Sequence, residues 1–333
     1  MRAEAATAGV SRTSPGLVLV VLGLLVAAVA TAFMTVGVKG NWEFVLALRG
    51  RKLAAIAFVA TAIAVSTVIF QTVTANRILT PSIMGFDALY VLMQTAAVFF
   101  FGSARISALD PRLAFVLEAG AMVGFSLLLY RWLFLGRRRN LHLLLLVGVV
   151  FGLFFRSLTT LFQRIIDPNE FVVLQDRLFA SFNAVAPALL AVAAIAIPAA
   201  CLLAWRMHDR LDVLLLGREQ AVNLGLDYRR SVSLVLVVVA LLVSVATALV
   251  GPLNGMEPVS FFGLLVASLA YAVMPSFRHR HVLPAAALIG ILVLVGGQLV
   301  LEQWLGFDSA VGIVIEFVGG ITFLLMLFRR MAR

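Results

Sequence analysis

The chain has 333 residues, of which 62% are hydrophobic and 13% are charged, and its mean hydropathy is +1.07. Soluble domains carry about 25% charged residues, so this composition excludes an ordinary soluble fold. The net charge of +10 does not indicate nucleic-acid binding, because the sequence has no basic patch with interleaved aromatic residues, and in a membrane protein an excess of arginine marks the cytoplasmic loops.

Apolar runs of about 17–25 residues follow one another along the chain, and a run of this length crosses a bilayer as one helix. Because every backbone N–H and C=O must be paired in lipid, we expect an all-α polytopic membrane protein. Residues 1–16 are expected to form an N-terminal tail, and residues 17–330 a single transmembrane domain. About ten transmembrane helices are expected, at residues 17–38, 53–73, 83–101, 113–133, 141–156, 184–205, 231–250, 259–274, 282–301 and 311–328.

The loops between these spans set the expected orientation. An even number of spans places both termini on one side of the membrane, and most of the arginines then lie in loops on that side. Because positively charged loops stay in the cytoplasm, we expect both termini to be cytoplasmic. One outer loop, residues 39–52, breaks this rule because it contains four cations, Lys39, Arg49, Arg51 and Lys52.

The longest cytoplasmic loop, residues 206–230, contains the stretch LGREQAVNLGLDYRR at 216–230. Apolar and polar residues are mixed there, with Leu216, Val222, Leu224 and Leu226 beside Arg218, Glu219 and Gln220. A short amphipathic helix or helix pair is expected, with Gly217 and Gly225 at its boundaries. A solvated linker is the alternative, but a linker does not need so many leucines, so the pattern favours a docking surface for a partner protein.

Neither a nucleotide site nor a metal site is expected. A P-loop needs a lysine directly after a glycine, whereas Lys39 follows a valine and Lys52 follows an arginine, and the chain has no other lysine. Any ATP-driven mechanism therefore requires a separate ATPase subunit, and the chain itself is not expected to be an enzyme. Cys201 is the sole cysteine, and the two histidines of RHRH at 278–281 lack the i,i+4 spacing of helical metal ligands, so no cofactor is expected.

Five blocks of sequence occur in an order that is informative. They are QTVTANRILTPSIMGFDALYVLMQ (71–94), DPNEFVVLQDRLFASFN (167–183), LGREQAVNLGLD (216–227), GPL (251–253) with FFGLLVA (261–267), and AVGIVIEFVGGITFLLMLFRR (310–330). Together they resemble the permeases of iron-siderophore and cobalamin ABC importers, the FecCD family, and the second block is similar to the petrobactin- and anguibactin-like subgroup. The chain departs from the usual pattern at Arg77, where a proline is common, and at Ala267 and Ser268, where many members have Pro-His.

The resemblance implies a cobalamin-permease-like fold and the function of a permease subunit that moves a ferric siderophore across the cytoplasmic (inner) membrane of a bacterium. Its implied partners are an ABC ATPase subunit, an extracytoplasmic siderophore-binding protein and a second permease subunit, with a heterodimer favoured and a homodimer possible. The residues implied in ATPase coupling are Leu216, Gly217, Arg218, Glu219, Ala221, Leu224 and Gly225. The cations implied in docking of the binding protein are those of RGRK, namely Arg49, Arg51 and Lys52; snorkelling at the membrane surface is the alternative role.

Two other function classes stay open at this point. An ion-coupled secondary transporter usually holds an ionisable residue well inside the membrane. The candidates Asp87, Glu118 and Glu316 are each expected within a turn or two of a helix end, which speaks against that class. A membrane-embedded enzyme or structural scaffold would need a polar constellation at one level of the bilayer, and the sequence indicates none.

Overall fold

The computed structural model describes residues 14–38, 41–135, 141–178, 182, 185–253, 261–305 and 319–322. Within these ranges, seven helices are long and apolar enough to cross a membrane. They are α1 (Pro15–Thr35), α2 (Trp42–Thr74), α5 (Pro111–Leu135), α6 (Leu141–Ile165), α8 (Pro187–Arg206), α11 (Tyr228–Val250) and α13 (His279–Val300). Two shorter apolar helices are α3 (Phe86–Phe101) and α12 (Phe261–Val273).

The short elements lie between these helices. They are the 3-10 turn η1 (Pro81–Met84), the helices α4 (Ser103–Ala108), α7 (Pro168–Leu178), α9 (His208–Leu214) and α10 (Arg218–Asn223), and the π-helical turn η2 (Leu301–Leu305). The predicted all-α class is confirmed. The predicted spans from 17–38 to 282–301 each coincide with an apolar helix, whereas most of the span predicted at 311–328 lies outside the described residues.

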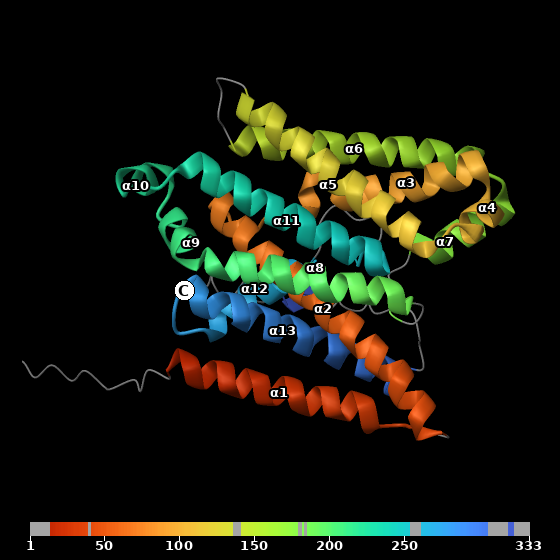
Figure 1. Cartoon of the computed structure of the whole chain (residues 1–333), viewed down its shortest axis with the longest axis horizontal. Helices are drawn as coiled ribbons and strands as arrows, with labels where there is room; N and C mark the ends of the chain where they lie inside the picture. The colour runs from red at the N-terminus through yellow and green to blue at the C-terminus, as the bar shows by residue number, and fades with distance from the viewer. Residues whose placement is uncertain are drawn as a thin grey trace, which may run out of the picture.

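The long helices run side by side, with α6 at one edge of the bundle and α1 at the opposite edge (Figure 1). Helix α2 packs against α8, α11, α12 and α13, and α11 packs against α2, α5 and α8. Because these two helices have neighbours on most sides, their apolar residues are largely buried, whereas α1 exposes most of its surface. The core of the bundle is therefore built around α2 and α11.

The two ends of the bundle carry different short helices. Helices α9 and α10 lie at one end, which we call the α10 end, and α4 and α7 lie at the other, which we call the α4 end (Figure 1). Because α10 directly precedes α11 in the chain, the polar stretch singled out in the sequence projects from the end of a long apolar helix.

Helix α2 begins earlier than the sequence predicts. The predicted span starts at residue 53, but the helix starts at Trp42, where the side chain of Asn41 accepts a hydrogen bond from the Glu43 N–H at 3.0 Å. Asparagine is a favoured N-cap because it pairs one of the free N–H groups of the first turn. Residues 42–52 of the predicted outer loop are therefore helical.

After α2 the chain turns back into the bundle before α3 starts. Ala75 adopts a left-handed conformation that ends α2, and the chain then passes through η1 to Gly85, which has φ +82°. Gly85 lies so close to α6 that a Cβ atom on it would be 3.0 Å from the Cα of Gly152. Small residues let backbones approach in this way within membrane helices, and as a result α3 begins inside the bundle.

Candidate functional site

Helix α10 has well-defined boundaries at both ends. Gly217 precedes it with φ +94°, and Gly225 follows it with φ +83°, conformations that glycine adopts without steric penalty. The Gly225 N–H donates to the Val222 carbonyl at 2.9 Å and the Leu226 N–H donates to the Ala221 carbonyl at 3.0 Å. This pair of bonds is the Schellman ending of a helix. The predicted short helix bounded by two glycines is thus confirmed.

One face of α10 is anchored and the other is free. Ala221 is fully buried, and α10 packs against α9 and α11. On the outer surface Leu216, Val222 and Leu224 are 56%, 52% and 64% exposed. Arg218 and Glu219 are exposed beside them. We call these five residues the coupling surface: Leu216, Arg218, Glu219, Val222 and Leu224. The surface contains both apolar and charged side chains, and it lies outside the long apolar helices.

The predicted docking cations lie at the start of α2, near the α4 end, and differ in exposure. Arg49 donates to the carbonyl oxygens of Phe33 at 2.9 Å and Val36 at 2.7 Å, at the end of α1 where carbonyl groups have no partner within the helix. The Val36 carbonyl also accepts a hydrogen bond from the Gln303 amide at 3.3 Å. Lys52 is buried and forms an ion pair with Glu302 of η2, whose carboxylate also accepts a hydrogen bond from the Gln298 amide at 2.6 Å.

Arg51 is the exposed member of this group. Its guanidinium donates to the Ala47 carbonyl of its own helix at 3.2 Å and has no ion pair among the described residues. Within RGRK, therefore, Arg49 and Lys52 make contacts inside the chain, and Arg51 between them faces outward.

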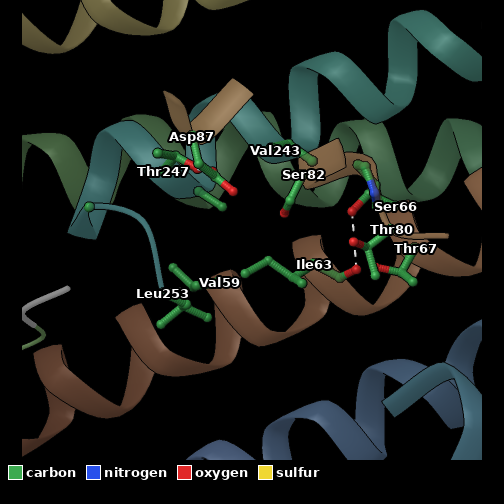
Figure 2. Close-up of a pocket in the computed structure, with 13 residues that line it drawn as sticks. Val59, Ile63, Ser66, Thr67, Thr80, Ser82, Asp87, Val243, Thr247 and Leu253 are labelled. Atoms are coloured by element: carbon green, nitrogen blue, oxygen red, sulfur yellow. Dashed lines mark hydrogen bonds between the residues drawn. The ribbon is translucent and has the colours of Figure 1, made fainter. Parts of the chain in front are cut away.

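A small polar pocket lies inside the bundle, bordered by the middle turns of α2, the segment around η1 and the last turns of α11 (Figure 2). Asp87 and Thr247 lie together on one side, with the Thr247 hydroxyl 3.4 Å from the Asp87 carboxylate. The hydroxyls of Thr67 and Thr80 are buried and make no hydrogen bond to the described residues. The cavity volume of about 20 Å³ suits one water molecule, which could satisfy these groups.

The ionisable residues that the sequence placed near helix ends can be located in two cases. Glu118 lies in the second turn of α5 and accepts a hydrogen bond from the Gln94 amide at 2.7 Å. Asp87 lies in the first turn of α3, but that turn is inside the bundle, so its nearness to a helix end does not place it near the membrane surface. Glu316 lies outside the described residues.

A larger cavity of about 420 Å³ opens towards the α4 end. Its volume is in the range of small-molecule sites. Glu118 and Gln94 contribute to its wall, and so does Arg177 of α7, which donates to the Ser107 hydroxyl at 2.7 Å. The carboxyl group of Glu118 and the guanidinium of Arg177 thus line one cavity of a size that suits a small molecule.

Comparison with known proteins decides between the classes that the sequence left open. The model of the FecCD transport family matches residues 15–329. The chain belongs to the FecCD transport family. It is 47% identical over 290 residues to the petrobactin import system permease protein YclO of Bacillus subtilis, covering 87% of this chain and 90% of the relative. It is 37% identical to the petrobactin import system permease protein FatC of Bacillus anthracis, covering 87% of this chain and 81% of the relative.

A solved structure supports the fold independently. An inward-facing metal-chelate type ABC transporter superposes with a TM-score of 0.83 and 20% identity, covering 95% of this chain and 99% of that one. The predicted family and its fold are therefore confirmed, and an ion-coupled secondary transporter is not the class. The family match decides this point. The position of Asp87 does not, because this carboxylate lies inside the bundle, where an ion-coupled carrier would also hold one.

Two polar contacts at the bundle ends were missed by the sequence reasoning. One is the Lys52–Glu302 pair, and the other joins Asp212 of α9 to His279 at the start of α13. The partners are 250 and 67 residues apart in sequence, so local pattern could not pair them. The sequence did carry a weak signal for the first pair. Lys52 and Glu302 are expected near the same face of the membrane, and each would need a partner of opposite charge if it were buried.

Proposed function

We propose that the chain is the permease subunit of an ABC importer that carries a ferric siderophore of the petrobactin class across the cytoplasmic membrane. The observation that carries this proposal is the coupling surface on a chain of the FecCD family: an exposed apolar ridge with charged neighbours, outside the spanning helices. The similarity to YclO and FatC, which are petrobactin import permeases, supports the cargo class. The sequence has no P-loop lysine, so ATP is hydrolysed by a partner.

The ATPase and the binding protein occupy opposite ends of the bundle, and the second permease subunit lies at its side. The ATPase docks on the coupling surface, which places the α10 end in the cytoplasm and agrees with the arginine distribution. The siderophore-binding protein then docks at the α4 end, and a second permease subunit lies beside this one in the membrane. The resemblance of residues 167–183 favours a heterodimer over a homodimer, and native mass measurement of the purified complex distinguishes the two.

The test is uptake by proteoliposomes that contain this chain, its partner permease and the ATPase, with loaded binding protein outside. We expect ferric petrobactin to accumulate with ATP inside and to stop when the ATPase carries a substitution that blocks hydrolysis, because the chain cannot supply that energy. Accumulation that continues with the inactive ATPase would refute an ABC importer. Uptake of other ferric chelates but not of petrobactin would refute the cargo.

Docking of the binding protein is expected to depend on Arg51. Charge pairs across an exposed interface mainly set encounter rate and orientation, so Arg51→Glu should weaken capture of the binding protein by roughly three- to tenfold at low salt. At an ionic strength of about 1 M, screening should remove most of the difference. Surface plasmon resonance on the permease in nanodiscs measures both values.

The control for Arg51 is Arg278→Glu, the same charge reversal at an exposed position near the α10 end, which should leave capture unchanged. Arg49 and Lys52 are unsuitable for this test, because their replacement would break contacts inside the chain. Equal capture by Arg51→Glu and the parent at low salt would exclude a docking role for this cation.

A further inference from the structure

We propose that Asp212, His279 and Thr72 form a hydrogen-bonded linkage that transmits movement of the coupling surface to the α2–α13 pair. This inference rests on the proposed function, because it needs an ATPase that moves α10. It assigns a positioning role to three residues that neither the family pattern nor the relatives' names single out.

The linkage starts at a single carboxylate on α9. Asp212 Oδ1 lies 2.6 Å from the His279 Nδ1 and accepts the His279 backbone N–H at 2.8 Å. Because one oxygen contacts both the ring and the backbone at the start of α13, the direction of α13 is fixed relative to α9. A neutral carbonyl or hydroxyl would hold the same donors less strongly, since hydrogen bonds to a charged group are shorter and stronger.

The ring of His279 continues the linkage to α2. Its Nε2 lies 2.7 Å from the Thr72 hydroxyl, in the last turns of α2. Both side chains are buried, His279 at 0% and Thr72 at 1% exposure. Separating them would leave the buried His279 Nε2 without a partner, which is costly in a medium of low dielectric, whereas the Thr72 hydroxyl would keep its hydrogen bond to the Val68 carbonyl at 2.9 Å. The three elements are therefore expected to move together.

Near the α10 end, neighbouring contacts also hold the segment after α2 against α12 and against the segment before α13. The guanidinium of Arg77 lies over the Tyr271 ring at 4.6 Å and near the Phe277 ring at 5.7 Å. The carbonyl of Arg77 accepts a hydrogen bond from the Gln71 amide at 2.8 Å. This gives a role to the arginine that replaces the usual proline of the family, since proline could make neither cation–π contact.

Further along, α2 and α13 pack backbone to backbone. A Cβ atom on Gly290 would lie 3.1 Å from the Ala60 carbonyl oxygen, so the two helices cannot separate or slide without a clash or a gap. Helix α9 also contacts both of them and α10. A force applied to α10 thus has a continuous path of packed and hydrogen-bonded contacts into the core of the bundle, and Asp212 makes the polar contact of this path between α9 and α13.

The first test replaces the linkage residues in the complete transporter. We expect Asp212→Ala, His279→Leu and Thr72→Val to keep the ATPase bound, because the coupling surface is intact, but to transport on the order of tenfold less siderophore per ATP hydrolysed, a typical size of coupling between sites. Thr159→Val, which removes another buried hydroxyl bonded to its own helix, is the matched control and should leave the ratio at the parent value.

The second test separates coupling from simple loss of stability. In a Cys201→Ala background, which has no other cysteine, Asp212→Cys with His279→Cys removes the polar linkage. It also places two thiols at positions whose native side chains are in contact, so that oxidation can be tested for a disulfide between them. The reduced protein should transport poorly, and the same preparation should regain transport on oxidation, since the disulfide reconnects α9 to α13, which still packs against α2 at Gly290. Reduction should reverse the gain.

The outcomes distinguish this inference from the proposed function. If the parent transporter shows ATP-dependent uptake but the single variants keep the parent ratio, or if oxidation lowers transport further, the linkage is refuted while the importer stands. If the parent itself takes up no siderophore with ATP, the proposed function fails first. Recovery on oxidation, together with a normal ratio for Thr159→Val, supports the linkage.

Discussion

Lys52→Met is expected to lower the free energy of unfolding by about 3–5 kcal/mol, because it leaves the Glu302 carboxylate buried without its cation. Both side chains are largely excluded from solvent, at 10% and 14% exposure. The remaining hydrogen bond from Gln298 does not neutralise the charge. Unfolding of the purified chain in mixed micelles with increasing SDS, followed by tryptophan fluorescence, measures the change.

The double variant Lys52→Met with Glu302→Gln should recover most of the loss. A buried ion pair replaced on both sides often changes stability little, because the desolvation cost of the two charges disappears with their attraction. The matched control is Arg51→Met, one residue away and exposed, for which a change within about 0.5 kcal/mol is expected. If Lys52→Met were as mild as Arg51→Met, the pair would not stabilise the junction of α2 with η2.

The predicted spans were accurate where hydrophobicity alone decides the structure. A long apolar run inside the membrane forms a helix, because only a helix pairs all its backbone N–H and C=O groups within one segment. This applies to α1, α5, α8, α11 and α13. The predicted start of α2 was wrong because the cations from Arg49 to Lys52 interrupt the apolar run. They end the run in sequence but not the helix, since Arg49 and Lys52 find partners on other segments.

The short helix α10 was predictable because its signals are local. Gly217 and Gly225 are needed for positive φ, and Ala221 is needed where the helix meets its neighbours. The start of α3 was not predictable in the same way. It depends on the close approach of Gly85 to α6, and a contact between segments more than sixty residues apart leaves no periodic pattern in either of them.

The coupling surface itself leads to the largest functional effect that we expect. Leu224→Asp with Gly225→Asp should abolish co-purification of the ATPase while the permease still inserts and folds. Leu224 is 64% exposed, so a carboxylate there costs the isolated chain little, yet it would be desolvated without a partner in an apolar groove of the ATPase. Pull-down of the ATPase from detergent extracts, with size-exclusion of the permease alone, measures both properties.

Two controls define what this double variant reports. Gly225→Asn alone should retain the ATPase, because asparagine tolerates the left-handed conformation at this position. This control shows whether a change at the end of α10 is enough to release the ATPase when Leu224 is kept. Leu109→Asp makes the same change from leucine to a carboxylate in an exposed loop at the α4 end and should also retain it. If the double variant bound the ATPase as well as these two controls, the apolar ridge of α10 would not be the contact, and the force that moves α2 and α13 would have to enter the bundle elsewhere.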